Sequence, residues 1–377
     1  MGLLKKIRFI AFMCLFAFVR LSANTLEKFS LEEKVGQLMM VHFIGKTVNE
    51  DAKILIQEIK VGGIIYYNWA NGLTSPRQVQ DLSVGLQKLT DENLFPFPLF
   101  IGVDQEGGRV TRLKEGFTQF PANRAVGETG DPNFAEEVAY CIGQELKAVG
   151  INMNFAPVVD VDSNPNNPII GMRSFGDDPE VVLNFGKKAL RGYKKANIIA
   201  TLKHYPGHGD VEVDSHLDLP IIHKSIEELK QVELFPFIGL SSDAEIIMTA
   251  HLLVPALDGD NCSTLSQKTL DYLRDTMQYQ GVIISDSLVM EGVLKRYHTV
   301  DEVAIQALNA GCDILLFGGR QLVDGNIQQE LTVKDFQRIH HSIVNAVKSG
   351  RISEERLNQA IERILDLKKK HFKLMLL

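Results

Sequence analysis

The segment from Lys203 to His216 is the richest in chemically active side chains. It reads KHYPGHGDVEVDSH and contains three histidines and two aspartates. Its glycines allow backbone conformations that a β-carbon forbids, as expected of a loop that folds over a ligand. Asp214 and His216 are two residues apart, so an extended backbone directs both side chains to one face, where the carboxylate orients and charges the imidazole. This pair is a candidate for acid/base catalysis.

A divalent metal is the alternative use of this cluster, because imidazole and carboxylate groups are its usual ligands. The candidate ligands are His204, His208, Asp210, Asp214 and His216. However, no pair has the HExxH spacing of a helical metalloprotease site, and the proline and glycines disfavour a helix. We therefore predict neither a metal nor a cofactor.

Asp286 is a candidate for a second catalytic group. It follows the apolar run 281–285, and the residues after it turn into a helix, so its carboxylate should project from the end of a strand. Glycoside hydrolysis usually needs two carboxyl groups, one of which forms a covalent glycosyl-enzyme in the retaining pathway. Two roles are open for Asp286: that nucleophile, or only a cap of the following helix.

Eight short apolar runs alternate with helical stretches and set the expected fold. The runs are 38–43, 63–67, 98–103, 151–155, 198–202, 245–249, 281–285 and 313–317, and helical periodicity occupies 131–148, 178–196, 225–237 and 299–310. Apolar strands joined by helices form a parallel sheet covered on both faces, and eight such units suggest closure. A doubly wound open sheet should carry a GxGxxG turn after its first strand, which is missing. We predict an α/β fold, a single (β/α)8 TIM-type barrel.

In such a barrel the active site lies at the C-terminal mouth, so the polar residues that follow the strands matter most. They are Asp104, Glu106, Arg109, Arg112, Asp160, Asp162, Lys203, His204, His251 and Asp286. We expect them to converge on one opening.

Four segments together resemble the family 3 glycoside hydrolases, in particular the bacterial β-N-acetylglucosaminidases that recycle peptidoglycan. They are GVDQEGGRVTR, NFAPVVDVDSNPNNPIIGMRSFG, KHYPGHGDVEVDSH and GVIISDSLVMEGV, and the resemblance runs from about Leu31 to Leu365. It implies that Asp286 is the nucleophile and that His216, held by Asp214, is the acid/base. It also implies which residues bind the non-reducing N-acetylglucosamine: Asp104, Arg112, Arg173, Lys203 and His204.

The departures from the family pattern are small: Tyr205 replaces a common phenylalanine, and Ser287 replaces an Asp or Ala. Many family 3 β-glucosidases carry a second domain that donates an acid catalyst, whereas this chain ends after one barrel, so we expect the His/Asp pair to supply the proton. The prediction is a retaining β-N-acetylhexosaminidase acting on peptidoglycan fragments. The alternatives are a β-glucosidase, an N-acetylglucosaminide phosphorylase, a metal-dependent hydrolase and a non-catalytic sugar-binding barrel.

Composition and the N-terminus limit the partners and the location. A net charge of −7 gives no basic footprint for nucleic acid, so we expect a small-molecule partner. The family resemblance implies that this partner is a β-N-acetylglucosaminyl saccharide, and we expect a monomer. Lys5, Lys6 and Arg8 precede the apolar run 9–19, which is far shorter than the roughly 20 residues of a membrane span. Residues 1–23 are predicted to be a signal peptide, or else an uncleaved anchor, and 24–377 the catalytic barrel. Export to the periplasm or envelope follows, with the cytoplasm as the alternative.

Two helices at the ends of the barrel are also expected. Ser30 and Glu33 form a capping box before the first strand. Ser353 caps an amphipathic helix near the C-terminus that ends in the lysine run 368–370, whose charges suit the helix dipole and need no functional role.

Overall fold

The computed structural model describes residues 26–91, 97–212, 219–297, 299–323 and 326–372. The predicted signal segment, Asp214 and His216 therefore lie outside the described residues.

Eight parallel strands form one sheet in the order β10-β1-β2-β3-β6-β7-β8-β9. They are β1 (Met39–Val41), β2 (Gly63–Ile65), β3 (Phe100–Val103), β6 (Met153–Asn154), β7 (Ile199–Tyr205), β8 (Ile246–Thr249), β9 (Val282–Ile284) and β10 (Leu315–Phe317). A parallel bridge between Ile284 and Ile314 joins the two outer strands, and the Ser285 N–H donates to the Ile314 carbonyl at 3.0 Å. The predicted TIM-type barrel is confirmed: seven of the predicted apolar runs contain one strand each, and β7 begins in the run 198–202 but continues to Tyr205.

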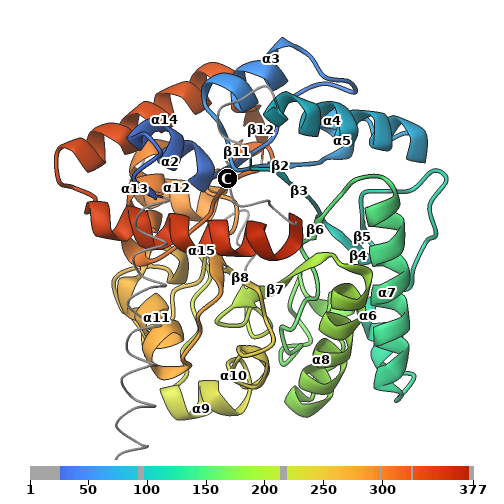
Figure 1. The fold of residues 1–377 in the computed structure, drawn as a ribbon. Helices are drawn as coiled ribbons and strands as arrows, with labels where there is room; N and C mark the ends of the chain where they lie inside the picture. The colour runs from blue at the N-terminus through green and yellow to red at the C-terminus, as the bar shows by residue number, and fades with distance from the viewer. Residues whose placement is uncertain (1–25, 92–96, 213–218, 298, 324–325, 373–377) are drawn as a thin grey trace, which may run out of the picture.

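Helices surround this sheet, and apolar side chains of the longer ones join the strands in one continuous core (Figure 1). They are α2 (Leu31–Leu38), α3 (Glu50–Lys53), α4 (Asn68–Asn71), α5 (Pro76–Asp91), α6 (Asn123–Gly127), α7 (Pro132–Ala148), α8 (Pro179–Ala196), α9 (Ile226–Gln231), α10 (Phe235–Leu240), α11 (Gln267–Asp271), α12 (Glu291–Tyr297), α13 (Val300–Ala310), α14 (Val333–Lys348) and α15 (Glu354–Phe372). Short π and 3₁₀ turns are η1 (Ile54–Glu58), η2 (Gly171–Arg173), η3 (Ser263–Leu265) and η4 (Tyr272–Thr276).

Local sequence explains where these helices begin. Asp131 and Asp178 accept the backbone N–H two residues on and are each followed by proline at the first helical position. The Ser30 capping box is present as predicted. The helix expected over 225–237 is two helices, α9 and α10, because the backbone at Val232 leaves the helical region and Pro236 starts a new helix.

Two small hairpins lengthen the loops at the mouth and were not predicted. The first pairs β4 (Gln105–Gly107) with β5 (Val110–Thr111) directly after β3. The second pairs β11 (Gln321–Val323) with β12 (Asn326–Gln329) after β10. Both are short and polar, so neither carries the alternating pattern by which a strand is recognised in a sequence.

Helix α15 lies across the opposite end of the barrel, in front of the strands in Figure 1. Lys368 on this helix is fully buried, and its Nζ donates to Gln37 Oε1 at 2.8 Å and to the Gly62 carbonyl at 3.1 Å. The charges of the lysine run were expected to suit the helix dipole, and the structure adds that Lys368 is buried against the base of the barrel. It stands four residues after Ile364 and so continues the buried stripe of the helix.

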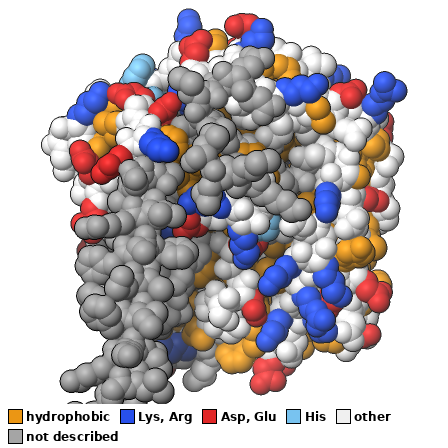
Figure 2. All heavy atoms as spheres, viewed as in Figure 1, with side chains coloured by type: hydrophobic (Ala, Val, Ile, Leu, Met, Phe, Trp, Pro, Cys, Tyr) orange, Lys and Arg blue, Asp and Glu red, His pale blue; other side chains and the backbone are white. Residues whose placement is uncertain are grey.

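On the face drawn in Figure 2, charges of both signs are mixed, and Lys and Arg side chains gather where α8 lies. Three cations of this helix, Lys188, Arg191 and Lys195, share the carboxylate of Glu136 on α7. Within the described ranges, no helix combines the length and the apolar character that a membrane span requires.

Candidate active site

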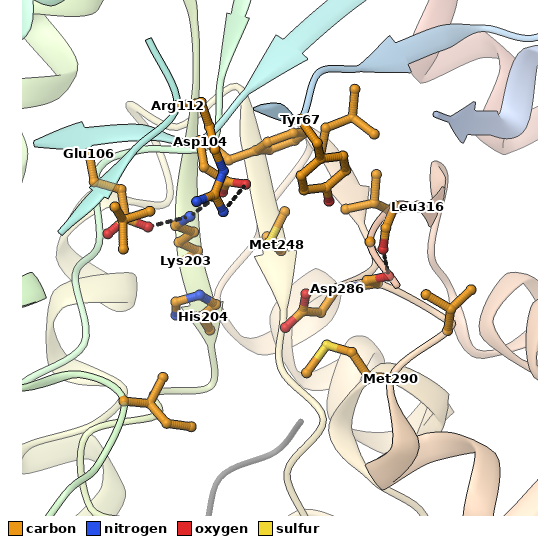
Figure 3. Close-up of a pocket in the computed structure, with 18 of the residues that line it drawn as sticks. Tyr67, Asp104, Glu106, Arg112, Lys203, His204, Met248, Asp286, Met290 and Leu316 are labelled. Carbon is orange, nitrogen blue, oxygen red and sulfur yellow. Dashed lines mark hydrogen bonds and ion pairs between the residues drawn. The ribbon is translucent and has the colours of Figure 1, made fainter. Parts of the chain in front are cut away.

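A cavity of about 350 Å³ opens at the C-terminal ends of the strands, where the barrel is expected to hold its active site (Figure 3). Polar and charged side chains line one part of it: Tyr67, Asp104, Glu106, Arg112, Arg173, Lys203, His204, His208, Asp286, Ser287 and Arg320. Apolar side chains line the rest: Ile65, Val110, Phe155, Ile169, Met248, Val289, Met290 and Leu316. All six of the described residues predicted for the site therefore border one cavity.

A buried charge cluster lies on one side of this cavity. Lys203 at the end of β7 contacts Asp104 Oδ1 at 2.9 Å and Glu106 Oε1 at 2.6 Å. Arg173 binds Glu106 through two nitrogens, with Nε–Oε2 at 2.9 Å and one terminal nitrogen to Oε1 at 2.8 Å. Arg112 lies 3.4 Å from Asp104 Oδ2. The cluster is a fixed array of paired charges, with donors and acceptors suited to sugar hydroxyls.

The pairing decides the charge state of both carboxyl groups. Burial by itself would raise the pKa of Glu106, but Arg173 and Lys203 outweigh it and hold that pKa far below its usual range. Burial would also raise the pKa of Asp104, but the charges of Lys203 and Arg112 outweigh it, so this pKa is lowered as well. Both carboxylates are therefore ionised and can accept hydrogen bonds from a ligand.

Asp160 orients the histidine that follows Lys203. Its Oδ2 lies 2.6 Å from His204 Nδ1, and its Oδ1 accepts the backbone N–H groups of His204 at 3.0 Å and of His208 at 2.7 Å. The other ring nitrogen of His204 lies 3.3 Å from an Arg173 nitrogen, a donor. Nδ1 therefore donates to Asp160 and Nε2 accepts from Arg173.

His208, which lies beside His204, is uncharged at neutral pH. Burial, together with neighbouring His204, lowers the pKa of His208 to about 4. The ring therefore lines the cavity as a neutral group.

Asp286 lies directly after β9, on the side of the cavity that faces His204 in Figure 3. Its Oδ1 accepts the Ser287 N–H at 2.7 Å, and its own N–H donates to Thr249 Oγ1 at 3.3 Å. The Ser287 hydroxyl donates to the Gly318 carbonyl. Helix α12 starts five residues later, at Glu291, so the alternative that Asp286 only caps this helix is wrong.

The cavity wall beside Asp286 is apolar. Met248 and Leu316 come from β8 and β10, and Met290 lies on the loop after Asp286 (Figure 3). The hydroxyl of Tyr67 packs against Gly318 on this side of the cavity. A β-carbon added at Gly318 would lie 2.6 Å from the Tyr67 oxygen. Glycine is therefore needed at position 318 for this close approach.

Not every strand-end residue reaches the cavity. Asp160 lies behind His204, and Asp162 pairs with Arg124. His251 is fully buried, and its Nε2 contacts the Ser287 carbonyl at 2.8 Å. Arg109 donates to the Ile169 carbonyl and also does not line the cavity. The expectation that all of these side chains converge on the opening is therefore wrong for these four, because each of them is bound by another group of the protein or buried beneath the mouth.

Glu106 was expected at the opening but was given no catalytic or sugar-binding role, and Tyr67 was not among the predicted site residues. Glu106 is 3% exposed and holds both Arg173 and Lys203 in place. Its signal was present, because it stands two residues after Asp104 in a polar run that follows a strand. Tyr67 ends an apolar run, so nothing in its sequence context separates it from a core aromatic.

The metal alternative finds little support in the described part of the cluster. Both ring nitrogens of His204 are engaged by Asp160 and Arg173, and Asp210 forms an ion pair with Lys224 at 2.8 Å. Among the residues that the structure describes, no three His, Cys, Asp or Glu side chains are grouped as ligands of one ion.

Comparison with known proteins places this barrel in a class and then in a family. Among solved structures, a glycoside hydrolase family 3 β-N-acetylglucosaminidase from Paenibacillus sp. str. FPU-7 superposes with a TM-score of 0.84 at 42% identity, covering 91% of this chain and 63% of that one. LpqI of M tuberculosis has a TM-score of 0.80 at 28% identity, with 92% and 96% covered. The fold is thus that of barrel domains in glycoside hydrolases.

The family follows from the sequence matches. The model described as Glycosyl hydrolase family 3 N terminal domain matches residues 30–367. Beta-hexosaminidase A of Pseudoalteromonas piscicida is 36% identical over 343 residues, which are 86% of this chain and 56% of that protein. Beta-hexosaminidase of Nitrosomonas eutropha is 32% identical, with 80% of this chain and 88% of the relative covered. This chain belongs to glycosyl hydrolase family 3, and it spans little more than half of the Pseudoalteromonas relative.

Proposed function

We propose that this protein is a retaining β-N-acetylhexosaminidase that removes a non-reducing β-linked N-acetylglucosamine from peptidoglycan fragments. The observation that carries the proposal is the position of Asp286, which faces His204 and the charge cluster around Lys203 across one cavity. A sugar whose hydroxyls bind that cluster has its anomeric carbon toward Asp286. The names of the relatives from Pseudoalteromonas, Nitrosomonas and Paenibacillus support the same activity.

The proposed reaction has two steps. The Asp286 carboxylate attacks the anomeric carbon while protonated His216 gives its proton to the departing glycosidic oxygen, so that an aspartyl ester forms as the glycosidic bond breaks. Neutral His216 then takes a proton from water, whose oxygen displaces Asp286 and restores the β configuration. Asp214 orients the imidazole. A histidine with an ordinary pKa near 6.5 can serve in both steps at neutral pH.

The apolar wall supports an N-acetylated substrate. The C2 substituent of the sugar is attached next to the anomeric carbon, so it lies within a few bonds of Asp286. Met248, Met290 and Leu316 border this place, and they offer an apolar surface to the methyl group of an acetamide, whereas a glucoside presents only a hydroxyl there.

Substrate preference tests this proposal. Aryl β-N-acetylglucosaminides should be cleaved with a kcat/KM at least about 100-fold above that of the matching β-glucosides, a difference of about 2.7 kcal/mol in transition-state binding. Equal rates would favour a β-glucosidase. Assays with muropeptides, chitooligosaccharides and intact glycan strands then rank the natural substrates, and a strong rate increase with inorganic phosphate would favour a phosphorylase.

The role of His216 is tested by the leaving group. His216→Ala should lower turnover of unactivated disaccharides by about 10²- to 10⁴-fold and that of nitrophenyl substrates by less in the first step, because a good leaving group needs no proton. Asp214→Ala should act in the same direction with a smaller or equal effect. A uniform loss across leaving groups would contradict the assignment of the acid.

We also propose that the protein is exported, from the basic start and the apolar run 9–19. N-terminal sequencing of material from the native cell should find a start near Asn24. Recovery of an intact Met1 from a cytoplasmic fraction would contradict export.

A further inference from the structure

Arg320 carries a positive charge at the rim of the cavity, and none of the roles described above uses it. It follows Gly318 and Gly319 after β10 and borders the cavity. Its side chain is 36% exposed, whereas that of Lys203 in the charge cluster is 3% exposed. A sugar that binds the charge cluster lies in the inner part of the cavity, so Arg320 is placed to meet what extends beyond this sugar.

An aromatic stack holds the Arg320 guanidinium in place. The Cζ atom of Arg320 lies over the Trp69 ring, 4.6 Å from its centre. Trp69 in turn stacks on Tyr67, with ring centres 5.4 Å apart and an angle of 24° between the ring planes. It also packs against the buried ring of His42, with 5.2 Å between ring centres. An arginine that is already stacked on a fixed ring loses less side-chain freedom when it binds a ligand.

One edge of this guanidinium is open to a ligand. Arg320 Nε donates to Glu330 Oε1 at 3.0 Å, and the Glu330 side chain is itself 33% exposed. Within the part of the chain that the structure describes, no other hydrogen bond or ion pair engages Arg320. Its two terminal nitrogens offer parallel N–H groups, the pattern that matches a carboxylate. In contrast, carboxylates of the protein already contact Arg112 and Arg173.

The loop that carries Arg320 is bound to the side of the cavity on which Asp286 lies. The Gly318 carbonyl accepts the hydroxyl of Ser287, which directly follows Asp286. Gly319 has a φ of +100°, which favours glycine and turns the chain at the end of the strand. Since the anomeric carbon is placed toward Asp286 and the aglycone begins at that carbon, Arg320 lies on the side from which the aglycone extends.

We propose that Arg320, supported by Trp69, forms a subsite for a carboxylate on the aglycone. The inference rests on the proposed hexosaminidase activity and adds the class of aglycone to it. This aglycone is an acidic sugar, such as an N-acetylmuramic acid whose lactyl carboxyl group is free, in place of the neutral sugar of a chitooligosaccharide. In a peptide-bearing fragment the same carboxyl group is an amide, so the subsite favours fragments from which the peptide has been hydrolysed.

The experiment compares two substrates that differ in charge: the β-linked disaccharide of N-acetylglucosamine and N-acetylmuramic acid, and the lactyl methyl ester of the same disaccharide. Nitrophenyl β-N-acetylglucosaminide, whose aglycone has no carboxylate, reports on the catalytic groups alone. Arg320→Met removes the charge, and Arg320→Lys keeps the charge without the paired N–H groups. Arg351→Met is the matched control, because Arg351 pairs with Glu302 at 2.6 Å, with 50% and 42% exposure, between α14 and α15 and away from the cavity.

The expected result is a preference for the acid that depends on Arg320. The wild type should cleave the acid with a kcat/KM about 5- to 20-fold above that of the ester, a reduced effect for a charged hydrogen bond because Arg320 is partly exposed. Arg320→Met should abolish this preference by slowing the acid alone, and Arg320→Lys should retain part of it. Arg351→Met should retain all of it. Turnover of the nitrophenyl substrate should stay near that of the wild type in every variant, which also shows that each variant is folded.

Trp69 provides a second measurement that does not require turnover. It is the single tryptophan of the chain, so the tryptophan fluorescence comes from the ring that lies under Arg320. In an Asp286→Ala background, which should leave the disaccharide intact, the acid should change this fluorescence and bind about 5- to 20-fold more tightly than the ester. Adding Arg320→Met should remove the difference between the two ligands.

Two outcomes separate this inference from the proposed function. Equal cleavage of acid and ester by the wild type, or a preference for the acid that survives Arg320→Met, overturns the subsite and leaves the proposed activity in place. A wild type that cleaves none of the N-acetylglucosaminides overturns the proposed function, and the Trp69 titration then decides by itself whether Arg320 binds the carboxylate.

Discussion

Lys203 at the mouth and Lys368 at the base are both buried in the same barrel, 2% and 0% exposed, yet their surroundings differ. Lys203 is bound by the carboxylates of Asp104 and Glu106. Lys368 is bound by the uncharged oxygens of Gln37 and Gly62 and lies 4.8 Å from the centre of the Phe100 ring. Carboxylates surround the amine of Lys203, whereas burial without any carboxylate lowers the pKa of Lys368 to about 7.

This difference in surroundings assigns Lys203 to the active site and Lys368 to the packing of the barrel. At the mouth, paired charges remain ionised in a low-dielectric cavity and are oriented before a ligand arrives, which is what binding and electrostatic catalysis require. At the base, the Lys368 amine completes the contact of α15 with the strands. The effect of burying this amine on the free energy of folding depends on pH. Substitutions at the mouth should therefore affect turnover, and substitutions at the base should affect stability.

The largest effect is expected for Asp286→Ala at the mouth. Without the nucleophile no covalent intermediate forms, so kcat should fall by at least about 10⁴-fold for every leaving group. The melting temperature should change little, because this carboxylate borders an open cavity. A fluorinated sugar should label the peptide that contains Asp286 in mass spectrometry. A label on Asp104 or Asp160, or substantial residual activity, would show that the nucleophile is another residue.

Lys203→Met should lower both stability and turnover, because Lys203 lies at the mouth but is as deeply buried as Lys368. Removing the cation leaves Asp104 and Glu106 facing each other in a buried site, so the free energy of unfolding should fall by about 3–5 kcal/mol in a denaturant titration. Loss of one charged hydrogen bond to the sugar should add about 1.5–3 kcal/mol, roughly a 10- to 150-fold fall in kcat/KM. Unchanged stability would mean that the cluster is not held by its charges.

Lys368→Met should have the smallest effect on turnover, within about 2-fold, and a pH-dependent effect on stability. The lysine pKa is lowered from 10.5 to about 7 in the folded protein, so between these values the unfolded chain binds more protons and the wild type gains stability as pH rises. The melting temperature of Lys368→Met minus that of the wild type should therefore decrease from pH 7 to pH 10. Lys369→Met, on the same helix and paired with Asp366 at 3.2 Å, is the control and should show no such trend. A pH-independent difference would mean that Lys368 is charged in its buried site.

The sequence by itself determined the barrel and most of the site. Eight apolar runs separated by helices leave few arrangements other than a closed parallel sheet, and each run overlaps one of its strands. Asp104, Lys203, His204 and Asp286 could be named because polar residues that follow successive parallel strands must meet at one end. These features depend on local pattern and chain order, which a sequence records directly.

Only the tertiary structure decided which charges contact each other and which residues stand behind the site. That Glu106 joins Arg173 to Lys203 requires the hairpin after β3 to fold toward the loop after β6, across 67 residues of sequence. The burial of Lys368 follows only from the position of α15 on the base of the barrel, and the contacts of Lys224 with Asp210 and Glu233 only from the folded chain. Periodicity specifies the face on which a side chain stands, but its partner, burial and pKa depend on distances between elements far apart in the chain, and folding alone fixes these distances.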